Sequence, residues 1–547
     1  MSGQRAGNGG VKADTNVEHR GEVSSRKSKT SCRYKRKIAN KGANHPAAET
    51  DTRNLLCCVL MLTLLSSEDS RRLRAFFEDA GYTETSLRKH LGAAELPSRQ
   101  LRNQPRLLDR TSAPIPLNVL LRWFWLALPQ DHAAAAGLIP AGMLSLMLES
   151  GLLSREGDSL IPQAMFLHID GFLVASDHAS AIDNKNVEMV LWPNPTSKFL
   201  ARFAVQRHSR ATLDLGTGSG ILSLNAARYS DAVVATDLNE RAVACARFNA
   251  RLNDVSNIEV RGGDCFAPVA GRRFDLILSN PPFFITPQGD YLFCENPMEL
   301  DGLCRRLVKE GPDYLNEGGY MQMLCEWAQI KGQPWEERIA EWLEGTGCDA
   351  WVMKGLTQDP EEYAQHRIRE TSQDPSQDAA SYAGYMQYYR HRGVEAIHDG
   401  LIVMRRREGH NWVRIEEVPS TPKSNLGEMI VSTFAAHDLM QQNSGDDQLL
   451  ALRPKLSPHV RLEQVCEQHE GQWHAEALTL RLINGFPFHV DVQPLVAEFL
   501  VTCDGTRTAG EAIQGLAANA NAPIERVQGE CLAMIRKLIE RGFMIAV

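Results

Sequence analysis

The sequence predicts an α/β protein built around a doubly wound sheet. From about residue 211, short apolar segments of strand length alternate with segments of helical periodicity. A glycine-rich turn follows the first of these segments, and polar residues follow the later ones. We expect seven strands, at ATLDL, AVVAT, IEV, FDLILS, GGYMQML, AWVMK and GLIVMRR.

Length and charge limit the classes of protein that fit. The 547 residues are 43% apolar and carry a net charge of −8, and a chain of this length holds roughly three or four domains. Residues 1–50 carry 11 Lys and Arg against 4 Asp and Glu, so the remainder carries −15. An acidic body argues against a broad nucleic-acid surface, which needs Lys and Arg at the phosphates.

The twelve cysteines contain no CxxC pair. They therefore predict neither a disulfide framework nor a zinc site, and we expect no metal. Reduced thiols in a cytoplasmic protein are the simpler interpretation.

Residues 1–60 are interpreted as a disordered basic segment. The apolar run Leu55–Leu65 has 11 residues, whereas a membrane-spanning helix needs about 20. A signal peptide lacks its A-x-A site here, and the basic run also fits a nucleic-acid tail. The favoured interpretation is that translation begins at Met61.

Residues 61–165 read as a helical, winged-helix-like domain. Ser67 is expected to cap a helix through EDSRRLRAFFEDAG that Gly81 ends. Two further helices are expected at LNVLLRWFWLAL and GMLSLMLESGLL, before a hairpin that turns at Gly157 and Asp158. Partner binding and a purely structural role both fit such a domain.

The α/β domain is expected over residues 166–430, and a linker with a second winged-helix-like domain over 431–547. Residues 408–450 read as loop-rich, with VPSTPKSN and NSGDDQ. Beyond them, three helices and a terminal strand are expected at PLVAEFLVTC, AGEAIQGLA and ERVQGECLAMIRKLIERGFMIAV.

The first strand ends in LDLGTGSGIL, with Asp214, Gly216, Gly218 and Gly220. Glycine is needed wherever the backbone turns tightly or approaches a ligand, so a tight turn alone also explains the motif. The dinucleotide fingerprint requires a glycine or alanine where this chain has Ile221. An NAD or FAD site is therefore disfavoured.

Three more polar residues follow the next strands. Asp237 lies 23 residues after Asp214, Asp264 follows the third strand next to Phe266, and Asn280 follows 16 residues after Asp264. Asp237 is placed to accept ribose hydroxyls, and Asp264 with Phe266 suits an adenine amino group and ring face. Each of these residues alone has a simple structural explanation, but together they converge on one crevice.

The fourth strand runs into SNPPF, with Asn280, Pro281, Pro282 and Phe283. Proline fixes its own φ, lacks an N–H and holds the preceding residue extended. The motif is therefore a rigid spur whose carbonyl groups are not committed to a helix. A rigid turn that closes the strand is the alternative interpretation.

Residues 211–325 resemble a class I S-adenosylmethionine-dependent methyltransferase. The matching segments are LDLGTGSGILSL, ATDLNERAVACARFNARLN, GGDCF and FDLILSNPPF, and they are most similar to the small-domain branch that includes the release-factor glutamine methyltransferases. The chain order also resembles multi-domain bacterial methyltransferases. The resemblance implies a Rossmann-like methyltransferase sheet, flanked by helical, winged-helix-like domains, and S-adenosyl-L-methionine as cofactor. It implies cofactor contacts at Asp214, Gly216, Thr217, Gly218, Gly220, Asp237, Leu238, Asp264, Cys265 and Asn280.

The resemblance implies methyl transfer to a planar nitrogen. The Asn280 side-chain oxygen and the Pro281 carbonyl would accept the two hydrogens of an amide or amino group, and Phe283 would stack on it. We assign the catalytic role to Asn280, Pro281, Pro282 and Phe283. Catalysis would then be mainly alignment and electrostatic stabilisation, with no metal.

The acceptor remains open between classes. Families with this motif methylate protein glutamine or exocyclic amines of nucleic acids. Residues 166–430 carry 27 Lys and Arg against 37 Asp and Glu, which favours a protein or small-molecule acceptor over RNA or DNA. A protein glutamine side chain is the leading expectation, with an RNA or DNA exocyclic amine as the alternative. Residues 66–160 are a loose counterpart of the glutamine enzymes' helical domain, but Asp183–Ser197, expected to fold over the cofactor, lacks their Arg-Glu-Thr-Glu run. A catalytically dead, cofactor-binding scaffold is the non-enzyme alternative. No membrane association is expected, and the oligomeric state is open.

Overall fold

The computed structural model describes residues 62–91, 105–178, 186–287, 292–372, 375–419, 422, 424 and 426–546. The predicted disordered segment 1–60 and the predicted start at Met61 lie outside these residues. So do the first three residues, 183–185, of the segment 183–197 that was expected to cover the cofactor. Among the helices described, none has the length and apolarity that a bilayer crossing requires.

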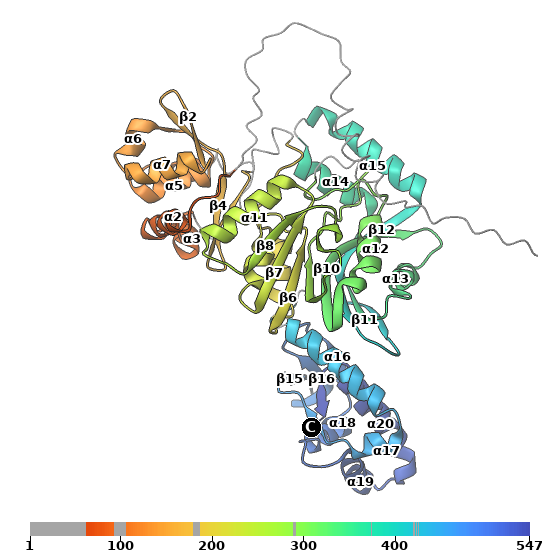
Figure 1. The fold of residues 1–547 in the computed structure, drawn as a ribbon. Coiled ribbons are helices and arrows are strands. Elements are labelled where there is room, and N and C mark those ends of the chain that lie inside the picture. Colours follow the sequence, from red (N-terminus) through yellow and green to blue (C-terminus); the bar gives the residue numbers. More distant parts are fainter. Residues whose placement is uncertain are drawn as a thin grey trace, which may run out of the picture. The chain divides into compact units, whose positions relative to one another are not determined.

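The amino-terminal region contains six helices and a small sheet among its described residues (Figure 1). The first helix begins one residue earlier than expected: Ser66, not Ser67, is the N-cap, because its backbone is extended and its hydroxyl accepts from the Asp69 N–H. The predicted hairpin turn at 157–158 is confirmed by the pairing of Glu156 with Ser159. The small sheet has the order β1-β3-β2. The elements are α2 (Ser67–Asp79), α3 (Glu84–Leu91), α4 (Pro105–Arg110), α5 (Pro116–Phe124), β1 (Gln130–Asp131), α6 (His132–Ala136), α7 (Ala141–Glu149), β2 (Leu153–Glu156) and β3 (Ser159–Pro162).

The main sheet confirms the predicted α/β architecture. Its order is β13-β11-β12-β10-β9-β6-β7-β8, and β12 runs antiparallel to both of its neighbours. All seven predicted strands are present, and β13 adds an eighth at the edge, parallel to β11. The strands are β6 (Ser209–Leu215), β7 (Ser230–Asp237), β8 (Ile258–Gly262), β9 (Phe274–Ser279), β10 (Leu315–Ile330), β11 (Cys348–Gln358), β12 (Val394–Arg406) and β13 (Val413–Glu417).

Two hydrophobic cores cover the two faces of this sheet. Leu276 and Leu278 of β9 belong to one core, and Ile277 between them belongs to the other. This is the alternation that a strand with both faces buried requires. The helices of this region are α9 (Pro195–Phe203), α10 (Ile221–Ala226), α11 (Glu240–Leu252), α12 (Gly302–Glu310), α13 (Trp335–Leu343), α14 (Pro360–Thr371) and α15 (Asp378–Arg392).

A hairpin before the sheet is attached to α11 by two asparagines. It consists of β4 (Met165–Ile169) and β5 (Phe172–Ser176). The Asn249 side chain donates to the Ala175 carbonyl and accepts from the Ala175 N–H, both at 2.8 Å. Asn253, one turn later, pairs in the same way with Leu173, both at 2.9 Å. The two amides therefore satisfy backbone groups of β5 much as a neighbouring strand would.

The prediction of a loop-rich linker over residues 408–450 is wrong. This segment contains β13, α16 (Leu426–Gln442) and most of α17 (Asp446–Ala451). Leu426, Ile430 and Phe434 of α16 are buried in the core that also holds one face of the main sheet. Burial of this apolar stripe stabilises a helix whose polar flanks looked like loop sequence.

The three predicted carboxy-terminal helices and the terminal strand are confirmed. The structure adds a three-stranded antiparallel sheet, β15-β16-β17, and a short strand that pairs with β18. Whether this region and the amino-terminal one are winged-helix-like stays a prediction. The elements are β14 (Pro454–Leu456), β15 (Val460–His469), β16 (Gln472–Leu482), β17 (His489–Val492), α18 (Pro494–Thr502), α19 (Ala509–Asn519), α20 (Ile524–Glu540) and β18 (Met544–Ala546).

Candidate active site

The predicted site residues lie at the carboxyl ends of four adjacent parallel strands. In the sheet, β9, β6, β7 and β8 are consecutive neighbours, and all three pairings are parallel. Asp237 ends β7, and Asn280 directly follows β9. In open α/β sheets this edge is where ligands bind.

The glycine loop after β6 has an open surface. Gly216 and Gly218 have φ of 80° and 55°, values that favour glycine. A Cβ at either position would meet no atom within 4 Å, so the loop leaves room for a ligand beside its backbone. Gly220 packs closely against α11, because a Cβ there would lie 3.3 Å from Ala246; its predicted contact with the cofactor stays a prediction.

Asp214 shapes this loop from within. Its carboxylate is fully buried and accepts from the Thr217 hydroxyl at 2.7 Å and from the Ser223 hydroxyl at 2.6 Å. The second oxygen, Oδ1, is buried with no partner among the described residues. Burial raises the pKa of Asp214. An unpartnered buried acceptor is costly, so this oxygen suits a ligand that brings a donor.

Asp237 ties the second strand to the same loop. Its carboxylate accepts from the N–H groups of Gly218 and Asn239, both at 2.9 Å. Burial raises the pKa of Asp237 to about 6. The next side chain, Leu238, is 49% exposed and provides an apolar surface beside the carboxylate.

The third strand gives one correction. Asp264 is half exposed and forms an ion pair with Arg306 at 3.1 Å, so it remains accessible at the site. Phe266, expected beside an adenine ring, is fully buried and stacks on Tyr314 with ring centroids 4.4 Å apart. The adjacent Cys265, at φ 45°, is only partly buried. Phe266 therefore belongs to one of the two hydrophobic cores.

Asn280 is held by two hydroxyl groups that the sequence did not indicate. Its Nδ2 donates to Ser197 Oγ at 3.1 Å and to Thr196 Oγ1 at 3.3 Å. Both hydroxyl residues lie in the first turn of α9, which Asn194 caps. Among the described residues, none donates to the Asn280 side-chain oxygen. The amide therefore presents a free acceptor.

The prolines and Phe283 form the rest of the motif. The Pro282 carbonyl accepts from the Asn296 side chain at 2.7 Å, and no hydrogen bond to the Pro281 carbonyl occurs in the described part of the chain. Phe283 is partly buried and meets Phe284 edge to face, with centroids 5.4 Å apart. The arrangement thus keeps the Pro281 carbonyl and the Asn280 oxygen as uncommitted acceptors.

Two tyrosines from α14 and α15 hold the end of the motif. Tyr363 accepts from the Ile285 N–H at 3.2 Å, and Tyr389 donates to the Ile285 carbonyl at 2.8 Å. Tyr363 in turn donates to Glu326 at 2.5 Å. Burial raises the pKa of Glu326 to about 8. Above the same loop, Arg367 lies 3.8 Å from the centre of the Phe284 ring.

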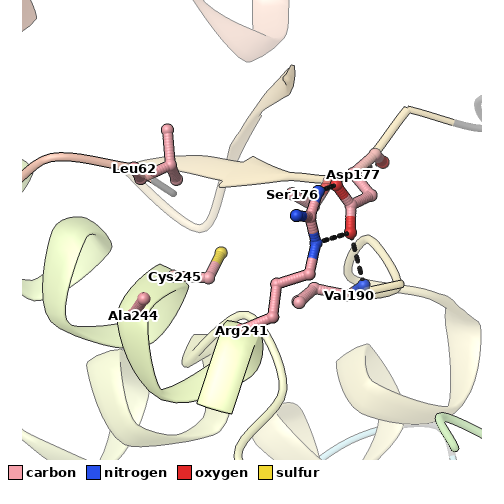
Figure 2. A pocket seen from close by; sticks show the side chains of 7 residues that line it. All are labelled: Leu62, Ser176, Asp177, Val190, Arg241, Ala244 and Cys245. Atoms are coloured by element: carbon pink, nitrogen blue, oxygen red, sulfur yellow. Dashed lines mark hydrogen bonds and ion pairs between the residues drawn. The ribbon is translucent and has the colours of Figure 1, made fainter. Parts of the chain in front are cut away.

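A buried ion pair holds the segment before α9 (Figure 2). Arg241 of α11 donates to Asp177 at 2.7 Å, and Asp177 also accepts from the Val190 N–H at 2.7 Å. The Asn239 side chain donates to the Glu188 carbonyl at 2.7 Å. These contacts fix residues 188–190 beside Asp237, next to the expected ribose position.

Comparisons with known proteins agree with this geometry. The family model of the methyltransferase small domain matches residues 193–331, and a domain of unknown function (DUF7782) matches residues 432–546. A putative protein N5-glutamine methyltransferase of Methanocaldococcus jannaschii is 33% identical over 139 residues, which cover 24% of this chain and 70% of that protein.

The chain belongs to the class I S-adenosylmethionine-dependent methyltransferases, in the branch of the release-factor glutamine methyltransferases. A release factor glutamine methyltransferase of Xylella fastidiosa is 37% identical over 156 residues, 25% of this chain and 56% of that protein. A ribosomal RNA small subunit methyltransferase C of Alcanivorax borkumensis is 30% identical over 113 residues, 21% of this chain and 31% of that protein. The chain thus spans little more than half of the Xylella relative.

The methyltransferase cofactor is S-adenosyl-L-methionine, and the residues present fit it. The open glycine surface, the unpartnered Asp214 oxygen and exposed Leu238 are the observations that support the fit. Sequence reasoning missed the hydroxyl pair at 196–197 and the two tyrosines. The segment PNPTS carries a helix-start signal that could have placed the hydroxyls near a helix terminus. No local signal points to tyrosines 78 and 104 residues from their partner.

Proposed function

We propose that this protein transfers the methyl group of S-adenosylmethionine to the side-chain nitrogen of a protein glutamine. The observation that carries the proposal is the pair of free acceptors, the Asn280 side-chain oxygen and the Pro281 carbonyl, at the strand end next to the glycine loop. An amide NH₂ has two hydrogens and is satisfied by two such acceptors.

The cofactor supplies an electrophilic sulfonium methyl group. The protein's own part is to bind and orient. Two acceptors on the amide hydrogens hold the nitrogen lone pair toward the methyl group and stabilise the positive charge that develops on nitrogen. Holding both reactants in line can lower the barrier by about 7 to 11 kcal/mol when the alignment is good. No side chain has to remove a proton before the transfer. When the new N–C bond forms, the S–CH₃ bond would break and S-adenosylhomocysteine would leave, and the nitrogen would then lose one of its two protons to water.

A protein acceptor is favoured over nucleic acid by charge. Residues 166–430 carry ten more acidic than basic side chains, 37 against 27, and nucleic-acid surfaces are basic. The named activity of the Xylella and Methanocaldococcus relatives supports glutamine as the acceptor.

An exocyclic base amine is the second candidate. The ribosomal RNA relative favours it, because a base amine is also planar and has two hydrogens. The same two acceptors would serve it, and the rigid prolines would position it equally well.

We further propose a cytoplasmic location, since the cysteines that the structure describes are all free thiols.

The experiment uses radiolabelled methyl donor and an extract from a strain that lacks this gene. Label that survives nuclease and is removed by protease supports a protein acceptor. Acid hydrolysis of the labelled protein should then release labelled methylamine, which identifies an amide nitrogen. A purified release factor from the same organism is the first defined acceptor to test. Label removed by nuclease alone would transfer the proposal to RNA or DNA.

A further inference from the structure

We propose that Thr196 and Ser197 are positioning residues that set which way the Asn280 amide faces. The inference rests on the proposed function, in which the Asn280 oxygen accepts from the methyl acceptor. It concerns a chain of hydrogen bonds from the first turn of α9 to the catalytic motif, which we call the amide relay: Asn194, Thr196, Ser197 and Asn280.

The relay has a fixed direction at its first member. The Ser197 backbone N–H, which can only donate, reaches Asn194 Oδ1 at 2.9 Å. This contact fixes the oxygen side of the Asn194 amide, since the opposite orientation would set two donors against each other. The contact is also the N-cap of α9, so the packing of that helix maintains it.

The fixed Asn194 oxygen in turn determines which way the Thr196 hydroxyl donates its hydrogen. Its hydroxyl lies 2.7 Å from the same Asn194 oxygen, and a hydroxyl has only one hydrogen to give. With that hydrogen donated to Asn194, Thr196 Oγ1 is an acceptor toward Asn280, 3.3 Å away. Ser197 Oγ accepts a second contact from the same nitrogen at 3.1 Å.

The consequence is one favoured orientation of the Asn280 amide. Its nitrogen faces the hydroxyl pair, and its oxygen is left for the methyl acceptor. If the amide turned over, its oxygen would face the Thr196 lone pairs, and its NH₂ would face the NH₂ of the methyl acceptor. Both of these contacts would be repulsive, whereas the Ser197 hydroxyl can either donate or accept, so Thr196 sets the direction. The relay therefore holds the Asn280 amide in the productive orientation before the methyl acceptor binds. The site is preorganised, because the amide does not have to turn during the reaction.

The test is a double-mutant cycle between Thr196→Val and Asn280→Ala. Thr196→Val keeps the shape of the side chain and removes the hydroxyl. We expect methyl transfer to fall about tenfold, as for a lost hydrogen bond, in kcat more than in KM for the acceptor. In the Asn280→Ala background the same substitution should cost nothing further. Thr196→Ser should restore the rate.

A readout independent of activity separates this inference from the proposed function. Side-chain ¹⁵N-labelled asparagine gives an NH₂ signal pair for Asn280, assigned by its loss in Asn280→Ala. We expect slow solvent exchange of this pair in the wild type and clearly faster exchange in a variant that combines Thr196→Val and Ser197→Ala. The affinity for S-adenosylhomocysteine, measured by calorimetry, should stay within about twofold, since the relay acts on the acceptor side.

Thr502→Val is the matched control, because it removes a hydroxyl that donates to the Phe499 carbonyl within α18, outside the amide relay. An unchanged Asn280 signal, or equal loss of rate from Thr196→Val with and without Asn280, would overturn the relay. If no wild-type acceptor is labelled at all, the proposed function fails, while the NMR result still decides the orientation.

Discussion

At the scale of single residues, Asn280 is the strongest point of the proposed mechanism. Asn280→Ala should lower methyl transfer by about two orders of magnitude or more, as expected for loss of a charge-stabilising contact. The affinity for S-adenosylhomocysteine should change little. Radiometric assay and calorimetry on the same preparations check both parts. A parallel loss of cofactor affinity would instead place Asn280 in the cofactor pocket.

Phe283 has a different expected role. Its ring is partly buried between two cores and meets Phe284 edge to face. Phe283→Ala should raise KM for the acceptor more than it weakens cofactor binding, because stacking on the acceptor is its proposed function. Phe283→Tyr keeps the ring and should be close to wild type. Equal losses in KM and cofactor affinity would favour a packing role.

Asp237 predicts how cofactor binding depends on pH. Burial raises its pKa to about 6 from an ordinary value of 3.8. If the ionised carboxylate accepts the ribose hydroxyls, the proton must leave before binding. Affinity for S-adenosylhomocysteine should therefore be constant above about pH 7 and fall below pH 6, by up to about tenfold per pH unit. Calorimetry from pH 5 to 8 measures this.

Asp237→Asn is the control for that titration. The amide retains the shape of the side chain but does not titrate. Its affinity for S-adenosylhomocysteine should therefore be weaker and show no step near pH 6. A step of equal size in this variant would assign the titration to another group.

At the scale of elements, Tyr363 of α14 and Tyr389 of α15 hold Ile285, just after the SNPPF motif. Tyr363 also donates to Glu326 of β10. The pKa of the buried Glu326 carboxyl, raised by burial to about 8, lies far above its ordinary 4.5. Between these pH values the native protein holds a proton that the unfolded chain has released. The contribution of this group to stability therefore falls as pH rises from about 4.5 to 8.

Glu326→Gln removes this titration. The decline in the free energy of unfolding between pH 5 and 8.5 should be shallower than in the wild type, by up to about 1.4 kcal/mol per pH unit. Urea unfolding at a series of pH values measures it. Identical pH profiles for the two proteins would show that Glu326 stays ionised in the fold.

At the scale of the whole molecule, the described fold begins near residue 62. Leu62 and Leu65 are buried in the large core, and the Thr63 N–H donates to the Ser150 carbonyl at 3.0 Å. A chain that starts at Met61 should fold and bind S-adenosylhomocysteine as the full chain does. Residues 1–50 have too little apolar and too much charged character to form a core.

A chain that starts at Ser70 is the contrasting variant. It lacks both leucines and the Ser66 helix cap, so we expect it to lose about 3 kcal/mol or more of stability. Chemical denaturation of the full chain, the chain from Met61 and the chain from Ser70 compares their free energies of unfolding. Loss of binding in the chain from Met61 would show that the preceding segment is structural.

The sequence by itself determined the parts of this protein that depend on local pattern. Alternation of apolar strands and helices predicted all seven core strands. Polar residues at successive strand ends predicted one site, because parallel strands bring those ends to one edge. Glycines at positive φ and a proline pair limit their own backbone, so Gly216, Gly218 and the SNPPF turn were readable without any neighbour.

Only the tertiary structure decided which distant side chains complete the site. The hydroxyls that hold Asn280 lie 84 and 83 residues away. Tyr363 and Tyr389, which bond the backbone of Ile285, lie 78 and 104 residues after it in the sequence. Phe266 was misplaced for the same reason: an aromatic ring is equally suited to a core or to a ligand, and the neighbours that bury it are set by packing. Contacts between residues so far apart in the sequence produce no periodic pattern. Each is a single pair of side chains whose position depends on how the helices pack against the sheet.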